Sequence, residues 1–171
     1  GVERTLSAED LMICNAEEPM CIGGVFGGLD SGVTEETKNI FIESAYFNPV
    51  SIRKTARRHG LNTDASFRFE RGIDPHNTIY ILKYAAMLIK ELTGGTIASE
   101  VTDIYPTPLN NFIVDVKIEK INSLIGKVIE TEQIERIFEG LEMKVLEKDN
   151  EGYKLEVPAY RVDVQRDVDV I

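Results

Sequence analysis

Short apolar runs separated by acidic or Gly-rich turns fill the first 47 residues of the chain. Three of these runs, at residues 11–14, 20–25 and 39–45, have the length and apolar content of β-strands. Because turn-forming residues lie between them, the pattern predicts a β meander in this part of the chain.

A helix is predicted directly after the meander. Pro49 follows Asn48 and suits the first turn of a helix, and Gly60 suits its end, so the helix is expected to run to about residue 58. This helix carries four basic residues, Arg53, Lys54, Arg57 and Arg58.

The clearest helical pattern follows further along the chain. Asp74 is a good N-cap, Pro75 stands at the first helical position, and Gly94 is suited to ending the helix. Apolar residues recur at helical spacing, which predicts a buried face. That face consists of Ile79, Leu82, Ala85, Ala86, Ile89 and Leu92. Residues 96–105 are then predicted to form a strand.

Residues 106–111 contain two prolines and two asparagines, a composition typical of a linker. We place a domain boundary here, between a first domain at residues 1–106 and a second at residues 110–171. The predicted fold class is α+β, with a mixed β and helical portion followed by a small α/β module.

The second module has the element order of a winged helix. Its predicted elements are a strand at 113–118, a helix at 119–125 ended by Gly126, a helix capped by Thr131, and strands at 142–147 and 153–157. A winged helix invites a DNA-binding hypothesis, but residues 110–171 contain nine Lys or Arg against fourteen Asp or Glu. A groove-reading module normally has a basic face, so no DNA partner is expected.

The whole chain is acidic, with 29 Asp or Glu against 19 Lys or Arg and a formal net charge of -10. This balance opposes attraction of the whole surface to polyanions. Any RNA contact must therefore be local or supplied by a partner. Residues 53–71, with six basic residues against two acidic ones, are the candidate for a local contact.

Cys14 and Cys21 lack the spacing of a metal site and are too few for a disulfide framework. No apolar run approaches the roughly 18 residues of a membrane span. The first residues also lack the regions of a signal peptide. These patterns predict a cytoplasmic protein with reduced thiols and no membrane partner.

The densest chemical signal is the run at residues 23–28, which contains four glycines. Without Cβ atoms, main chain can approach a ligand or another strand closely. Glu43 follows sixteen residues after Gly27, in an apolar run where a carboxylate either points to solvent or needs a buried partner. The pattern predicts a site made largely of backbone.

Four stretches, at residues 24–28, 57–66, 68–75 and 158–163, together resemble the β chains of bacterial phenylalanyl-tRNA synthetases, in the family's order. The resemblance covers nearly the whole chain. It implies the latter part of a tRNA-editing module, followed by the small winged-helix-like module beside the catalytic core. The parent enzyme would be a phenylalanine–tRNA ligase.

The resemblance also implies the partners of such a subunit. In the family the β chain pairs with an α subunit in an α2β2 tetramer and acts on tRNA(Phe). ATP is a substrate of the parent enzyme, and this fragment is not expected to bind it.

The same resemblance implies a pocket that hydrolyses mischarged tyrosyl-tRNA(Phe). Glu43 matches the family residue that binds the tyrosine hydroxyl, Gly27 matches a pocket-lining glycine, and Thr63 and Ala65 match positions on the pocket wall. Each also has an ordinary alternative. Glu43 suits a solvent-facing strand position, Gly27 a tight turn, and Thr63 a turn or helix cap.

Hydrolysis of an aminoacyl ester needs a positioned water and stabilisation of the oxyanion, which backbone amides and hydroxyls can supply. No catalytic residue is therefore assigned. The family pocket also uses a histidine upstream of these motifs, and residues 1–22 contain none. We expect the isolated fragment to have weak or no editing activity.

Asp163 and Asp169 match two family positions that bind Mg²⁺, and the next two family ligands would fall beyond residue 171. Two carboxylates make only a partial magnesium site, so no tight metal binding is expected in this chain. The alternative is an acidic first turn of a helix, which needs no ion.

A noncatalytic role remains open beside editing. In that alternative, both modules brace the subunit assembly and guide RNA. Arg53, Lys54, Arg57 and Arg58 are candidate contacts to tRNA phosphate under either reading. Pairing with neighbouring carboxylates is the alternative for Arg68 and Arg71.

Overall fold

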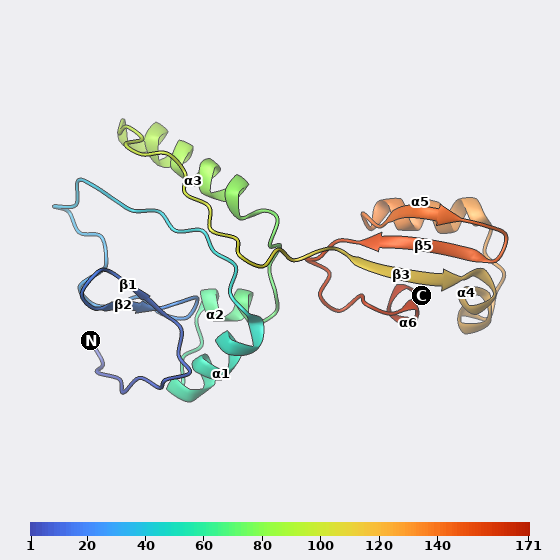
Figure 1. Cartoon of the computed structure of the whole chain (residues 1–171), viewed down its shortest axis with the longest axis horizontal. Coiled ribbons are helices and arrows are strands. Elements are labelled where there is room, and N and C mark those ends of the chain that lie inside the picture. Colours follow the sequence, from blue (N-terminus) through green and yellow to red (C-terminus); the bar gives the residue numbers. More distant parts are fainter. The chain divides into compact units, whose positions relative to one another are not determined.

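The computed structural model describes all 171 residues, and the chain divides into two compact units, Gly1–Asp103 and Ile104–Ile171 (Figure 1). Each unit combines helices with one small antiparallel sheet, so the predicted α+β class is confirmed. No helix in the chain combines the length and apolar character needed to cross a bilayer.

Unit 1 contains a two-stranded sheet and three helices. Strand β1 (Met12–Cys14) pairs antiparallel with β2 (Pro19–Ile22). Helices α1 (Pro49–His59), α2 (Asp64–Phe69) and α3 (Thr78–Thr93) follow in order.

Helix α1 begins and ends where the sequence predicts. The Asn48 side chain accepts hydrogen bonds from the amides of Val50 and Ser51, and Pro49 occupies the first turn. Gly60 ends the helix in the left-handed conformation, where its amide bonds back to the last turn.

The core of unit 1 is small and lies between β2, the Gly-rich loop at residues 23–28 and α1. Its buried residues are Ile22, Val25, Ile52 and Ala56, with Met12, Phe47, Leu61 and Phe69 packed around them. The Phe47 and Phe69 rings meet at a centroid distance of 5.0 Å, so α2 is also held against this core.

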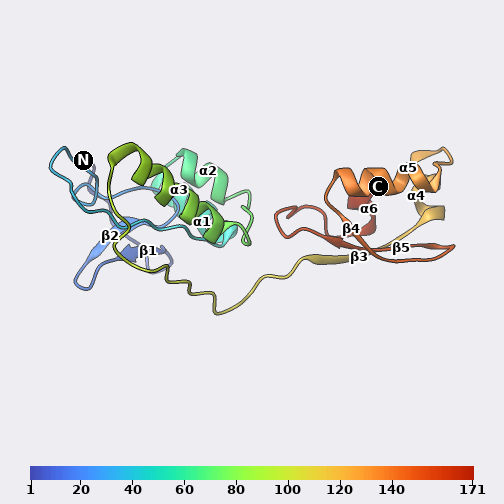
Figure 2. The ribbon, with the colours of Figure 1, turned by 90° about the horizontal axis from the view of Figure 1, so that it is seen from above.

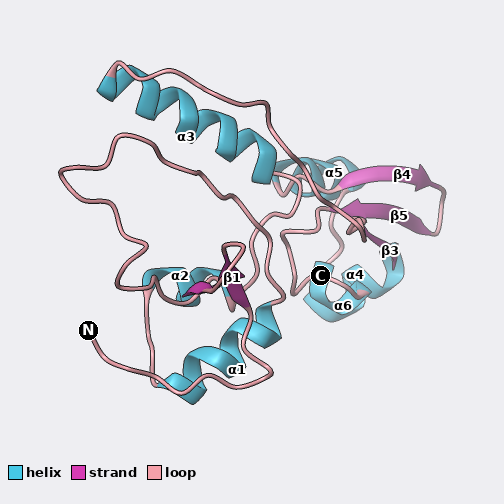
Figure 3. Ribbon diagram, turned by 60° about the vertical axis from the view of Figure 1, so that its left-hand side comes forward, coloured by secondary structure: helices cyan, strands magenta, loops and turns pink.

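Two predicted strands are wrong. Residues 39–45 and 96–105 have strand-like composition, but neither segment pairs with any strand (Figure 3). A strand needs a neighbour for its backbone amides and carbonyls, and no part of the chain supplies one here. The first 47 residues therefore form one short hairpin and long loops instead of a meander.

Helix α3 differs from its prediction in two ways. The Asp74 carboxylate accepts the amide of His76, so a turn precedes the helix, which begins at Thr78 with Asn77 as N-cap. No residue of α3 is buried, because no other helix or strand contacts it. Five of the six residues of the predicted face are half-buried, and Leu92 is exposed.

Unit 2 contains a three-stranded antiparallel sheet in the order β3-β5-β4. The strands are β3 (Phe112–Lys117), β4 (Lys144–Lys148) and β5 (Gly152–Val157). Helices α4 (Ile118–Ile125) and α5 (Thr131–Gly140) lie on one face of this sheet (Figure 2). The predicted element order of strand, two helices and hairpin is confirmed.

The core of unit 2 lies between that sheet face and the helices. On β5, Tyr153, Leu155 and Val157 alternate as buried residues, and Phe138 of α5 meets the Tyr153 ring edge-on. One local prediction is wrong, because Glu130 and not Thr131 is the N-cap of α5. A last helix, α6 (Asp167–Val170), lies near the C-terminus.

Candidate functional site

The Gly-rich loop at residues 23–28 folds back on the end of β2. The Ile22 amide donates to the Phe26 carbonyl at 2.9 Å, and the Ile22 carbonyl accepts the amides of Val25 and Phe26 at 3.0 Å. The Val25 side chain points into the core and is 2% exposed, whereas Phe26 and Gly27 are exposed. Val25 therefore anchors the loop and leaves Gly27 on its outer surface.

The glycines of this loop have different roles. Gly24 has a φ of +67°, and a Cβ there would lie 2.8 Å from Phe47 and 2.9 Å from Ile52. A Cβ on Gly28 would lie 1.9 Å from the Met20 carbonyl oxygen. A Cβ on Gly27 would meet nothing within 4 Å, and its φ is not positive. Close packing accounts for Gly24 and Gly28 and leaves Gly27 without a structural need for glycine.

Thr63 connects α2 to this loop. It is the N-cap of α2, where its hydroxyl accepts the Ser66 amide at 3.0 Å and donates to the Val25 carbonyl at 2.7 Å. The Ser66 hydroxyl in turn accepts the Thr63 amide at 3.0 Å, which completes a capping box. The Thr63 hydroxyl proton is thus already committed, and neighbouring Ala65 is exposed.

Glu43 lies in the unpaired segment that precedes α1. It makes no hydrogen bond or ion pair with the chain, and the residue as a whole is exposed. Its carboxyl group is nevertheless partly removed from water, and this burial raises the pKa of Glu43. Burial also raises the pKa of the Cys21 thiol, with a further contribution from the nearby Glu43 charge. Both cysteines are free.

Of the four predicted pocket residues, Thr63 alone is bonded to the Gly-rich loop, through the Val25 carbonyl. Glu43 forms no hydrogen bond or ion pair with Gly27 or Ala65. A surface depression of about 270 Å³ lies elsewhere on unit 1, and none of the four lines it. Its lining residues are Glu9, Asn48, Val50, Ser51 and Lys54.

Two backbone amides at the end of the loop have no hydrogen-bond acceptor in the chain. The Gly23 amide donates to the Leu11 carbonyl at 2.9 Å, and those of Val25 and Phe26 bond within the loop. The amides of Gly27 and Gly28 donate to no acceptor in the chain. These two amides can bind a carbonyl or an oxyanion.

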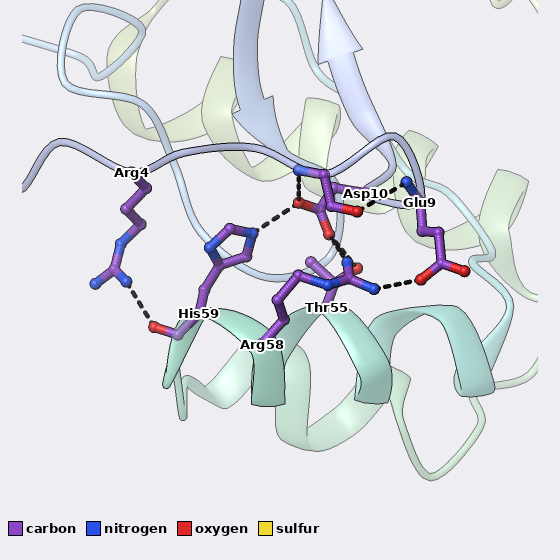
Figure 4. A network of polar contacts seen from close by, with 7 residues as sticks. Arg4, Glu9, Asp10, Thr55, Arg58 and His59 are labelled. Atoms are coloured by element: carbon purple, nitrogen blue, oxygen red, sulfur yellow. Dashed lines mark hydrogen bonds and ion pairs between the residues drawn. The ribbon is translucent and has the colours of Figure 1, made fainter.

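A buried polar network that sequence reasoning missed joins α1 to the N-terminal segment (Figure 4). The Asp10 side chain is 0% exposed. Its carboxylate contacts the His59 Nε2 atom at 2.7 Å, accepts the Thr55 hydroxyl at 3.0 Å and forms an ion pair with Arg58. Arg58 also pairs with Glu9 at 2.5 Å.

The partners of Asp10 set its pKa. Burial alone would raise the pKa of this carboxyl, but the Ser7 amide, His59 and Thr55 bind the charged form and lower it to about 2. The Ser7 amide donates to the Asp10 carboxylate at 2.8 Å, and the Asp10 amide donates back to the Ser7 carbonyl at 3.0 Å. This spacing of Ser and Asp, typical of caps, was the available sequence signal.

The candidate RNA-contact residues fall into two groups. Arg58 is held by Glu9 and Asp10, whereas Arg53, Lys54 and Arg57 are exposed and form no ion pair. Beyond the helix, Arg71 pairs with Glu70 at 2.9 Å, as the alternative interpretation allowed, and Arg68 forms no ion pair.

The two aspartates near the C-terminus have different surroundings. The Asp169 carboxylate is occupied by Arg166 at 2.8 and 3.0 Å and accepts the Arg166 amide at 2.9 Å. These bonds hold the pKa of Asp169 at about 2. Asp163 is exposed, and no group of three or more His, Cys, Asp or Glu side chains in the chain is arranged to hold a metal.

Comparison with known proteins adds to this geometry. Residues 1–94 match the family model described as a B3/4 domain. The chain belongs to the B3/4 domain family. Residues 114–171, after the B3/4 part, match the model of the tRNA synthetase B5 domain.

Three relatives of this B3/4 chain are phenylalanine–tRNA ligase beta subunits. The chain is 65% identical over 171 residues to a phenylalanine–tRNA ligase beta subunit of Bacteroides fragilis, and 55% identical over 172 residues to that of Porphyromonas gingivalis. It is 38% identical over 171 residues to that of Geobacter sulfurreducens. Each match covers 100% of this chain and 21% of the relative, so the chain spans about a fifth of their length.

Substitution can distinguish the packed glycine of the loop in this B3/4 chain, Gly24, from the exposed one, Gly27. Gly24→Ala should destabilise the chain by about 3 kcal/mol, since the new methyl group would clash with Phe47 and Ile52 at a positive φ. Gly27→Ala is the matched control and should change stability by less than about 0.5 kcal/mol. Urea unfolding followed by circular dichroism measures both. Equal losses would contradict the assignment.

The Asp10 network predicts a pH-dependent contribution to stability. Because the pKa of Asp10 is lowered on folding, its contribution is present above about pH 4 and is lost as the pH falls through about 2. Asp10→Asn should therefore cost about 2 kcal/mol at neutral pH and little near pH 2.

The measurement is the difference in unfolding free energy between the native chain and Asp10→Asn over this pH range. Asp30→Asn is the control, because Asp30 is exposed and makes no ion pair. If the difference in unfolding free energy between the native chain and Asp10→Asn stays constant across this pH range, the charge of Asp10 does not contribute to stability.

Proposed function

We propose that this chain is part of the β subunit of a phenylalanine–tRNA ligase. The observation that carries the proposal is its 65% identity, over all 171 residues, to the Bacteroides fragilis phenylalanine–tRNA ligase beta subunit. The whole enzyme would join phenylalanine to tRNA(Phe) with ATP, in the cytoplasm and together with an α subunit. Formation of the aminoacyl adenylate is assigned to that α subunit and not to these residues.

Within this enzyme, the contribution proposed for unit 1 is hydrolysis of tyrosyl-tRNA(Phe). An apolar pocket sized for a phenyl ring cannot strongly reject an analogue that only adds a hydroxyl, and discrimination of about a hundredfold is typical. A second site that hydrogen-bonds the phenol reverses this bias, because phenylalanine would leave its polar groups unpaired.

Gly27 is the residue proposed to border the tyrosyl ring. Support comes from the free space in front of it, since a Cβ there would meet nothing within 4 Å. The unbonded amides of Gly27 and Gly28 are proposed to bind the ester carbonyl as it becomes an oxyanion. Thr63 has a positioning role in this scheme, because its hydroxyl holds the loop through Val25.

Glu43 is proposed to accept the phenol hydroxyl of the tyrosyl group. It has no partner within the chain, and partial burial raises its pKa, so its carboxylate gains from a new hydrogen-bond donor. Ala65 completes the proposed wall as a small exposed residue.

Magnesium is proposed only for the whole enzyme. Asp169 is held by Arg166 here, and Asp163 is exposed and belongs to no group of three or more potential metal ligands. Both would need further oxygen ligands. A noncatalytic scaffold remains the second candidate, because none of the four proposed pocket residues lines the depression of unit 1.

A bulky residue at position 27 tests the pocket. In the complete αβ enzyme, Gly27→Trp should abolish hydrolysis of tyrosyl-tRNA(Phe), because the indole would occupy the space proposed for the ring, while phenylalanine charging continues. Gly32→Trp is the matched control, since a Cβ at this exposed glycine also meets nothing within 4 Å. Unchanged hydrolysis in Gly27→Trp would place the pocket elsewhere and favour the scaffold.

Glu43→Gln tests the proposed phenol contact. The variant keeps the shape of the side chain but loses the charged acceptor, so tyrosyl-tRNA(Phe) hydrolysis should fall by roughly tenfold to a hundredfold. Subunit assembly and phenylalanine charging should not change, and Glu36→Gln serves as the exposed control. Loss of assembly or of tRNA affinity, with tyrosine discrimination intact, would instead support the scaffold.

A further inference from the structure

The basic residues of unit 1 are concentrated in one segment. Residues 1–103 contain ten Lys or Arg, and six of them lie between residues 53 and 71. The rest of the unit carries four basic residues against thirteen acidic ones. Helix α1 itself contains no acidic residue. The outer side of this helix therefore has a local charge opposite to that of its surroundings.

The Asp10 network divides the basic residues of α1 into two sets. Arg58 and His59 point toward the segment that holds Asp10 (Figure 4), and their charge is matched there. The other set consists of Arg53, Lys54 and Arg57, which are exposed and form no ion pair. We call these three residues the α1 basic face.

Folding alone does not explain the α1 basic face. Arg57 lies in the last turn, where a cation is stabilised by the helix dipole. Arg53 and Lys54 lie further from that end, and Arg53 stands four residues before Arg57, a spacing at which like charges repel. None of the three contacts a carboxylate that would offset this repulsion.

The buried side of the same helix supports the Gly-rich loop. Ile52 and Ala56 pack with Val25 in the core, and Ile52 limits the space beside Gly24. The α1 basic face and the loop that carries Gly27 are thus joined through one short helix. A ligand held by the basic face is held in a fixed relation to that loop.

We infer that the α1 basic face binds phosphates of the RNA whose aminoacyl ester reaches the Gly-rich loop. This inference rests on the proposed function, which supplies an aminoacyl-tRNA as the substrate. Phosphate contacts by Lys and Arg fix the register and orientation of a nucleic acid without reading its sequence. The face is therefore a positioning surface, and its residues take no part in the hydrolysis itself.

The test compares two variants of the complete αβ enzyme that lose the same charge. One carries Arg53→Gln, Lys54→Gln and Arg57→Gln. The control carries Lys83→Gln, Lys90→Gln and Lys127→Gln, which removes three exposed basic residues that also form no ion pair. Binding of uncharged tRNA(Phe) is measured over a series of KCl concentrations, and hydrolysis of tyrosyl-tRNA(Phe) is measured at varied substrate concentration.

Binding of tRNA weakens as salt rises, so the slope of log binding constant against log salt is negative. Loss of three phosphate contacts should make this slope less negative by about 2 to 3 and weaken binding at least about tenfold at low salt. The KM for tyrosyl-tRNA(Phe) hydrolysis should rise in the basic-face variant while kcat stays the same. The control variant should retain the native slope and KM.

Two results would overturn the inference. One is a basic-face variant with the slope and KM of the control. The other is loss of α-subunit assembly with normal RNA affinity in the assembled fraction, which would make the face a protein contact. Failure of the proposed function is a separate result, namely unchanged hydrolysis in Gly27→Trp. If the basic-face variant still shows a weaker salt dependence in that case, the RNA contact remains supported.

Discussion

The buried carboxylate of Asp10 is the constraint on which unit 1 depends. A charge removed from water is tolerated only when it is paired and hydrogen-bonded, and Asp10 obtains these partners from α1 through Thr55, Arg58 and His59. The N-terminal segment is thereby fixed to the helix. The Asp10 side chain has little apolar surface, yet its contacts with α1 help to fix which side of the helix faces inward.

From that helix the rest of the unit follows. With Arg58 and His59 turned toward Asp10, Ile52 and Ala56 face the small core, where Val25 of the Gly-rich loop joins them. Thr63 then holds the same loop from the start of α2. Few apolar residues are buried here, so polar contacts and close glycine packing position the loop.

Local signals in the sequence were sufficient where a feature depends on neighbouring residues. Asn48, Pro49 and Gly60 bound α1 because caps act within one turn. The alternation that buries Leu155 and Val157 likewise identified a strand of unit 2. These elements carry their own start, stop and periodicity.

Features that depend on distant partners could not be predicted. Residues 39–45 have the composition of a strand but no strand beside them, and α3 has an apolar stripe with nothing packed over it. The spacing of Ser7 and Asp10 is a local signal, but the partners of Asp10 on α1 lie about fifty positions away, so no local pattern specifies them. Among the loop glycines, a positive φ and the packing of Phe47 and Ile52 distinguish Gly24 from Gly27.

The open space at Gly27 has a consequence for how this protein can change over evolutionary time. At most positions in a packed loop, a new side chain changes both the stability of the fold and the shape of the surface. Selection for a new surface shape is then limited by the loss of stability. At Gly27 a new side chain extends away from the core and leaves the supporting contacts of Val25 untouched. Mutation there can reshape the outer surface of the loop gradually, without a matching loss of the folded state.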